Sequence, residues 1–172
     1  MRPAPLDRPG ASTGPETRRT QWVLLVGAAV LAVIDLILKS VAEARLSETG
    51  TVDLGLLTLQ LHHNTGVAFS LGAGLPTGVV IAATGAIIVG LVWYLLIAAP
   101  TLNRLARAGA TLMLGGAVGN FLDRLDGGGV VDYLHTGWFP TFNLADVFVT
   151  TGAGLLILGT LMDPAPRGAS TE

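Results

Sequence analysis

Four long apolar stretches constrain the fold of this chain more than any other feature of its sequence. They cover about residues 22–40, 75–99, 105–122 and 144–162. A helix of roughly 20 apolar residues, with a range of about 17–25, crosses the hydrocarbon core of a bilayer. The buried helices of a soluble domain are rarely all this long and this poor in charge. The pattern therefore predicts an α-helical integral membrane protein with four transmembrane helices.

The composition agrees with a membrane location and excludes several functions. Hydrophobic residues make up 51% of the chain and charged residues 13%, whereas soluble domains carry about 25% charged residues. The formal net charge of −2 provides no basic surface for nucleic acid. Cysteine is absent, which excludes disulfides, thiol nucleophiles and thiolate metal ligands.

The two ends of the chain differ from the apolar stretches. Residues 1–20 hold four prolines and almost no large apolar side chains, so we expect a disordered cytoplasmic tail there. We expect the membrane domain over 21–163 and a second cytoplasmic tail over 164–172. The first apolar stretch could instead be a secretory signal peptide, because the sequence AEA at 42–44 resembles a cleavage site. Its length and the charges near its end favour a retained helix.

The positions of lysine and arginine predict the orientation. Seven of them lie in the two tails and in the connection between the second and third stretches, and three lie on the other side. Cytoplasmic segments carry the excess of positive charge, so both termini are expected in the cytoplasm. The connections at about 43–73 and 123–143 then face the extracytoplasmic side. Apolar residues alternate around Leu57, Leu59 and Leu61, which predicts a small platform of short strands at the membrane surface.

Charged and amide side chains gather where the apolar stretches meet the extracytoplasmic side. Such groups are costly at membrane depth and usually mark function. A simpler interpretation of Asp35 and Lys39, which are four residues apart, is an ion pair at the membrane interface. A simpler interpretation of Asp123 and Arg124 is that they anchor a helix end. The full set of candidate site residues is Asp35, Lys39, Asn64, Asn120, Asp123, Arg124, Asp132, Asn143 and Asp146.

Two other groups of residues have simpler interpretations. Glycines at 115, 116 and 119 predict close packing between helices, because small residues let membrane helices approach each other. Three histidines, at 62, 63 and 135, could bind a metal, but they lack the spacing of a metal-binding helix. We expect no metal and no cofactor.

Asp132 and Asp146 lack an obvious basic partner nearby in the sequence. Two carboxyls held together at low dielectric cannot both ionise, so one keeps a proton while the other can accept one from water. In an aspartic peptidase the ionised carboxylate activates water, and the protonated carboxyl donates to the scissile carbonyl and assists the leaving amine. The sequence permits this chemistry without proving it.

The motifs "DLILK", "NTGVAFS", "GGAVGNFLDR", "GGVVDY" and "FNLAD" stand in this order on the four predicted helices. In this combination the chain resembles the bacterial lipoprotein signal peptidases (signal peptidase II) over about residues 22–162. The resemblance implies a membrane aspartyl endopeptidase of the bacterial inner membrane, with its active site on the extracytoplasmic face. It would remove signal peptides from prolipoproteins by cutting just before a diacylglyceryl-modified cysteine.

The resemblance also implies roles for individual residues. The catalytic pair falls on Asp132 and Asp146. Residues expected to line or support the site are Asn64, Asn120, Asp123, Arg124, Asn143, Asp35 and Lys39. The implied partners are lipid-modified prolipoproteins and membrane lipid, and we expect a monomer that does not bind nucleic acid. The chain departs from the family pattern at Leu36 and Leu38, where polar residues are usual, and at Val147, where serine is common.

Two functions of other classes remain as alternatives. A small transporter or channel subunit would need polar residues deeper in its helices, but the second stretch offers only Thr77 and Thr84, and the fourth only three threonines. A non-catalytic membrane scaffold could retain the same fold, and the intact Asp132–Asp146 pair argues against it.

Overall fold

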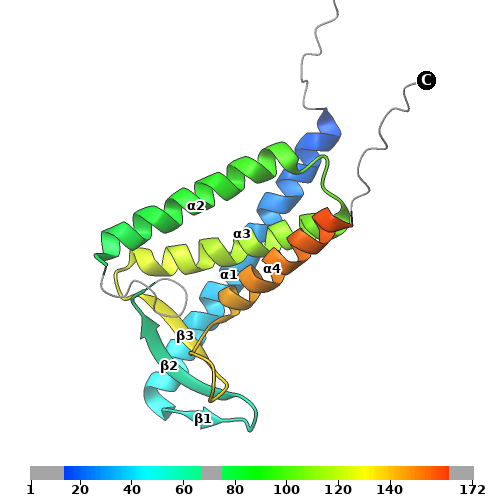
Figure 1. Cartoon of the computed structure of the whole chain (residues 1–172). Coiled ribbons are helices and arrows are strands. Elements are labelled where there is room, and N and C mark those ends of the chain that lie inside the picture. The colour runs from blue at the N-terminus through cyan, green and yellow to red at the C-terminus, as the bar shows by residue number, and fades with distance from the viewer. Residues whose placement is uncertain (1–13, 67–74, 163–172) are drawn as a thin grey trace, which may run out of the picture.

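The computed structural model describes residues 14–66 and 75–162. The elements follow the chain in the order α1 (Pro15–Thr49), β1 (Val52–Asp53), β2 (Thr58–Asn64), α2 (Thr77–Ala98), α3 (Arg104–Leu125), β3 (Val130–His135) and α4 (Leu144–Leu161). The helices form a bundle with the strands together at one end, while the start of α1 and the end of α4 lie at the opposite end (Figure 1). The bundle thus separates the sheet from both ends of the described chain.

Helix α3 is the centre of the bundle. It packs against each of the other helices, most extensively against α4. A Cβ atom added at Gly109 of α3 would stand 2.6 Å from the carbonyl oxygen of Gly152 on α4, so this contact requires glycine on both helices. The buried apolar core around α3 consists of Ala28, Leu95, Leu102, Ala106, Ala110 and Leu114.

The close helix packing predicted for three glycines of α3 is confirmed at two of them, Gly115 and Gly116. Added Cβ atoms would meet the carbonyl oxygen of Ala28 on α1 at Gly115, and that of Ala145 on α4 at Gly116. At Gly119 an added Cβ would lie 2.6 Å from Oδ2 of Asp35. This third glycine therefore makes room for a carboxylate and not for another helix backbone.

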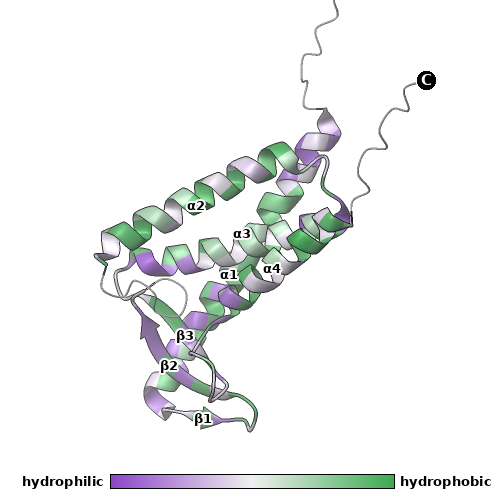
Figure 2. Ribbon diagram, viewed as in Figure 1, coloured by the Kyte–Doolittle hydropathy of each residue, from purple (hydrophilic) through white to green (hydrophobic). Residues whose placement is uncertain are grey.

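The outer surface of the bundle is apolar. Helices α1, α2 and α4 are each long and apolar enough to cross a membrane, whereas α3, within the described residues, does not belong to that group. Figure 2 shows more hydrophilic and neutral residues along α3 than along α2. The third predicted stretch is a helix as expected, but it is enclosed by three neighbours and needs fewer apolar residues to face lipid. Large apolar side chains exposed on the other helices include Val26, Val30, Val33, Ile87, Val89, Ile97, Ile157 and Leu161.

Helix α1 is longer at both ends than the predicted span over 22–40. Its 35 residues correspond to about 50 Å of helix, against about 30 Å of hydrocarbon core. Residues 15–20 are helical, so the expectation of disorder is wrong for them, and the rest of both predicted tails lies outside the described residues apart from Gly14. The last turns of α1 extend under the sheet, where Leu46 packs with Val131 and Tyr133.

The three strands form an antiparallel sheet in the order β1-β2-β3. The strands predicted around 57–61 are confirmed by β2. Strand β3 was not predicted, because the sequence indicated strands only around Leu57, Leu59 and Leu61. The first four residues of β3 are all buried, so the strand lacks the alternation of apolar and polar residues that identifies a half-exposed strand.

Candidate active site

Asp132 is buried in β3, with 1% of its surface exposed. Strand pairing places Val130 of β3 opposite Asn64, the last residue of β2. The side-chain amide of Asn64 donates to Oδ2 of Asp132 at 3.2 Å. Oδ1 of Asp132 accepts from Nδ2 of Asn143 at 2.6 Å. The sheet and the residue preceding α4 therefore fix both oxygens of this carboxyl.

Asp146 occupies the first turn of α4 and forms a capping box with Asn143. Oδ1 of Asn143 accepts from the backbone N–H of Asp146 at 3.0 Å, and Oδ2 of Asp146 accepts from the backbone N–H of Asn143 at 3.2 Å. A capping box satisfies two N–H groups at the start of a helix that have no partner within it. The other carboxylate oxygen of Asp146 accepts from Nδ2 of Asn120 at 2.8 Å.

Asn143 joins the two carboxyls directly. Its side chain donates to Asp132 and its backbone donates to Asp146, and no part of it is exposed. The same amide group also donates to Oδ1 of Asn120 at 3.1 Å. One buried asparagine therefore sets the position of the strand carboxyl relative to the helix carboxyl.

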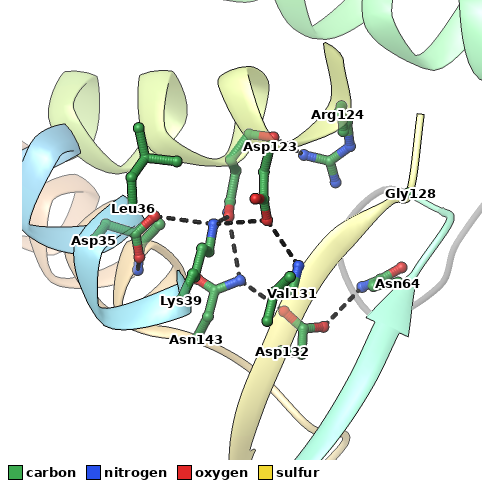
Figure 3. Close-up of polar contacts among 12 residues, drawn as sticks. Asp35, Leu36, Lys39, Asn64, Asp123, Arg124, Gly128, Val131, Asp132 and Asn143 are labelled. Carbon is green, nitrogen blue, oxygen red and sulfur yellow. Dashed lines mark hydrogen bonds and ion pairs between the residues drawn. The ribbon is translucent and has the colours of Figure 1, made fainter. Parts of the chain in front are cut away.

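Lys39, the single lysine of the chain, lies behind this pair and is 1% exposed. Its ammonium group is 2.9 Å from Oδ2 of Asp35 and 3.3 Å from Oδ2 of Asp123. It also donates to Oδ1 of Asn120 at 2.7 Å. The i,i+4 pair of Asp35 and Lys39 predicted from the sequence is confirmed, and Figure 3 shows Lys39 between the two aspartates. A buried ammonium group with three oxygen partners is satisfied without water.

The two aspartates beside Lys39 hold the backbone next to the candidate catalytic pair. Oδ1 of Asp35 accepts from the N–H of Ala145 at 2.9 Å, and Ala145 directly precedes Asp146. Oδ2 of Asp123 accepts from the N–H of Val131 at 2.7 Å, and Val131 directly precedes Asp132. One buried lysine therefore orients two carboxylates, and each of these fixes the main chain beside one member of the pair.

Arg124 lies in the last turn of α3 and binds backbone oxygens. Its guanidinium donates to the carbonyl of Asn120 at 2.9 Å and to the carbonyl of Gly66 at 3.0 Å. The N–H of Gly66 donates to Oδ1 of Asn64 at 3.0 Å. Arg124 and Asn64 therefore both hold Gly66.

The electrostatic surroundings of Asp132 favour its protonated form. Burial raises the pKa of its carboxyl from 3.8 to about 6, and the negative charge of Asp146 adds to the rise. Hydrogen bonds from Asn64 and Asn143 and the charge of Lys39 oppose that rise in pKa and leave it incomplete. The pair can therefore hold one proton at a mildly acidic pH.

A cavity of about 230 Å³ opens onto both carboxyls. Its lining combines the polar groups of the site with apolar side chains of α2, α3, α4 and β3. These lining residues are Asn64, Thr84, Ile87, Ala117, Asn120, Arg124, Val130, Asp132, Thr141, Asp146, Val149 and Thr150. Because Asp132 and Asp146 both line this cavity, a water molecule that enters it can reach both carboxyls.

All nine candidate site residues from the sequence belong to this connected arrangement. The backbone groups of the site could not be predicted, because no side-chain type marks them. They are the N–H groups of Val131 and Ala145 and the carbonyl of Gly66. The N-x-x-D spacing of Asn143 and Asp146 is the sequence signal that could have predicted the capping box.

Two of the three histidines have contacts with different side chains. His63 is 3.2 Å from Oε1 of Glu43, and Nδ1 of His135 is 3.4 Å from the hydroxyl of Thr141. Among residues 14–66 and 75–162, no three histidine or acidic side chains come together as metal ligands would.

The fold and the site define a class: a polytopic membrane protein in which two carboxyls, one buried and one half-buried, are joined through a buried asparagine at a cavity at one end of the helix bundle. Residues 27–162 match the family described as Signal peptidase (SPase) II. Lipoprotein signal peptidases of Brucella ovis and Brucella canis are each 41% identical to this chain over 146 residues, which is 82% of this chain and 91% of each relative. The chain therefore belongs to the signal peptidase II family of aspartic peptidases, as its motifs predicted.

Solved structures agree with this assignment. A structure described as a bacterial membrane enzyme has a TM-score of 0.71 and 27% sequence identity, and the match covers 87% of this chain and 93% of that one. A second structure with the same description has a TM-score of 0.67 at 27% identity, over 82% of this chain and 94% of the other. The expected fold, four helices with a small strand platform, is confirmed.

Proposed function

We propose that this protein removes signal peptides from prolipoproteins, with Asp132 and Asp146 as its catalytic pair. The observation that carries the assignment is Asn143, which is buried and hydrogen-bonds to both carboxyls. A helix cap alone would require only the contacts with Asp146. The additional contact with a carboxyl on a separate strand has no role in capping, and it fixes the geometry of a pair.

The two carboxyls are assigned different roles. Asp132, with its pKa raised to about 6, is the acid that donates a proton toward the oxygen of the scissile carbonyl. Asp146 is the base, because its carboxylate accepts hydrogen bonds from Asn143 and Asn120 and lies at a helix N-terminus, where negative charge is stabilised.

The reaction then follows in two steps, each with two proton transfers. Asp146 takes a proton from water while the water oxygen attacks the carbonyl carbon and Asp132 protonates the carbonyl oxygen. The resulting tetrahedral diol collapses as Asp146 returns its proton to the leaving nitrogen and Asp132 regains a proton from a hydroxyl group. Peptide C–N cleavage releases an acid and an amine, and both aspartates end in their starting states.

The position of the pair supports a substrate held at the membrane surface. Strand β3, which carries Asp132, and the start of α4, which carries Asp146, lie where the apolar bundle meets the sheet (Figures 1 and 2). A cysteine that carries a diacylglyceryl group is held at the same depth by its own acyl chains, so the bond just before it reaches the pair without extraction from the bilayer. We assign cleavage to this bond.

We place the protein in the bacterial inner membrane with both termini in the cytoplasm and the pair on the extracytoplasmic side. This orientation rests on the arginine distribution. It is supported by the start of α1 and the end of α4, which both lie at the end of the bundle opposite the sheet. A retained α1 is supported because cleavage after Ala44 would remove Asp35 and Lys39 from the site. All groups of the site come from one chain, so we expect a functional monomer, and no nucleic-acid partner.

The test is a cleavage assay with purified protein in detergent. One substrate carries the diacylglyceryl group on the cysteine, and its matched control has the same peptide sequence without lipid. We expect cleavage of the lipidated peptide only, at the bond before the cysteine, and no effect of a chelator. Equal cleavage of both peptides would remove the lipid from substrate selection, and cleavage of neither would favour the scaffold or transporter alternative.

The departures from the family pattern bear on substrate range and not on the chemistry. Leu38 is 41% exposed and Val147 is 39% exposed, and neither belongs to the buried polar centre. Val147 lines a surface cavity that also contacts Asp146. Leu36 lines a different cavity, with Lys39 and Asp123. We infer that these three residues leave the catalytic pair unchanged.

A further inference from the structure

A second cavity lies at the opposite end of the bundle from the carboxyl pair. It has a volume of about 550 Å³ and is formed by the first turns of α1 and of α3. Its polar lining includes Arg19 from α1 and Arg104 and Arg107 from α3, with Glu16 as the one acidic side chain among its described lining residues. Figure 2 shows that the start of α1 is hydrophilic, in contrast to the middle of the helix.

The three arginines present unused donors to this cavity. Arg19 and Arg104 are exposed. Arg107 is half-buried, and its Nη2 donates to the carbonyl of Pro100 at 3.3 Å. The Nε of Arg107 is buried and has no hydrogen-bond partner among the described residues. Guanidinium groups bind phosphate through paired N–H donors, and a cavity with three of them and one carboxylate carries an excess of positive charge.

The same cavity has an apolar side. Val23 of α1 is 63% exposed, and Leu24 and Ala108 complete the apolar part of the lining. Beyond the cavity, α1 carries Val26 and Val30, whose side chains are both more than half exposed. A phosphate bound by the arginines would therefore have an apolar helix face directly beside it, running in the direction of the membrane.

We propose that this cavity binds the headgroup of an anionic glycerophospholipid of the cytoplasmic leaflet. The phosphate contacts Arg19, Arg104 and Arg107, and an acyl chain lies along Val23 and Val26. The proposal rests on the orientation given above and is independent of the roles assigned to the carboxyl pair. Each arginine near an anionic membrane surface contributes about 1 kcal/mol, which is about a fivefold change in affinity.

Lipid bound here would stabilise the pairing of α1 with α3. Just beyond the cavity the two helices are in close contact, because a Cβ added at Gly27 would stand 2.9 Å from Cγ2 of Thr111. Farther along, the same two helices carry Lys39 and Asn120, which bond to each other. A ligand that bridges the helices at one end therefore supports the arrangement at the other.

The experiment compares thermal stability in neutral detergent with added phosphatidylglycerol or phosphatidylcholine of the same acyl chains. We expect phosphatidylglycerol to raise the melting temperature more than phosphatidylcholine does. In an Arg19→Gln/Arg104→Gln variant we expect the half-saturating phosphatidylglycerol concentration to rise about 10- to 30-fold. Both side chains are exposed, so the variant should fold, and native mass spectrometry of retained lipid gives a second readout.

Arg45→Gln is the matched control, because Arg45 is exposed on the same helix at its other end and its loss changes the charge equally per residue. We expect this variant to respond to phosphatidylglycerol as the unmodified protein does. An unchanged response in the double variant would overturn the proposal, and so would an equal loss per arginine in Arg45→Gln. A stabilisation of the same size by glycerol phosphate alone would make the ligand a soluble phosphate and overturn the lipid assignment.

Discussion

Replacing Asp132 with asparagine should abolish cleavage and at the same time stabilise the folded protein at neutral pH. The rise of the Asp132 pKa from 3.8 to about 6 means that the folded state resists ionisation of this group. At about 1.36 kcal/mol per pKa unit, the ionised carboxyl costs the folded state about 3 kcal/mol. Asparagine removes that cost. Its single amide oxygen accepts only one of the two hydrogen bonds from Asn64 and Asn143, and the lost hydrogen bond lowers stability by about 1 kcal/mol. The expected net gain is about 2 kcal/mol.

The pH dependence follows from the same pKa. A group whose pKa is higher in the folded state binds more protons there between about pH 4 and pH 6, so the unmodified protein loses stability as pH rises through this window. The asparagine variant lacks this loss. In detergent at pH 7.5, the asparagine variant should therefore melt at a clearly higher temperature than the unmodified protein. At pH 4 the two melting temperatures should be similar, or that of the unmodified protein should be the higher. A variant that is less stable at pH 7.5, with the same pH dependence as the parent, would refute the reasoning.

Four further substitutions test how the pair is supported. Lys39→Met leaves the buried carboxylate of Asp35 and the partly buried carboxylate of Asp123 without a counter-ion. We therefore expect a loss of about 3–5 kcal/mol in stability and of about 100-fold in turnover, measured by melting and by cleavage on one preparation. Arg124→Lys keeps the charge but loses the fork that holds two carbonyls, and turnover per folded molecule should fall about 10- to 100-fold, while Asn64→Ala should cost less; full turnover in Arg124→Lys would remove the positioning role. Gly119→Ala places a methyl group against Asp35, and we expect a loss of about 1–3 kcal/mol that a melting curve without a downward shift would contradict.

Much of the fold could be predicted because the bilayer restricts the choice so strongly. Apolar stretches of sufficient length have few alternatives to membrane-crossing helices, and their boundaries at α2 and α4 agree closely with the structure. The ends of α1 were less predictable, because its last turns are stabilised by packing under the sheet and not by lipid. Strand β3 could not be identified from its pattern, since burial on both faces removes the alternation on which the prediction depends.

The candidate site was predictable in its members and not in its connections. Polar side chains at membrane depth can be recognised in the sequence because their burial there is unfavourable. The i,i+4 spacing of Asp35 and Lys39 already indicated a contact between them. The function of that contact depends on Ala145 and Val131, whose N–H groups are held by Asp35 and Asp123. Backbone groups carry no sequence signal, so only the folded arrangement reveals that the lysine cluster positions the carboxyl pair.

The most direct test of the central claim is the turnover of Asp132→Asn, Asp146→Asn and the double variant on one lipidated prolipoprotein peptide. Because Asp132 and Asp146 act as a single catalytic unit, either substitution alone should remove nearly all of the turnover that the pair supports. We predict that each single variant falls to the background of the assay and that the double variant is no slower, while all three remain folded by their melting curves. A single variant with near-parental turnover would contradict the claim, as would single losses that are partial and multiply in the double variant.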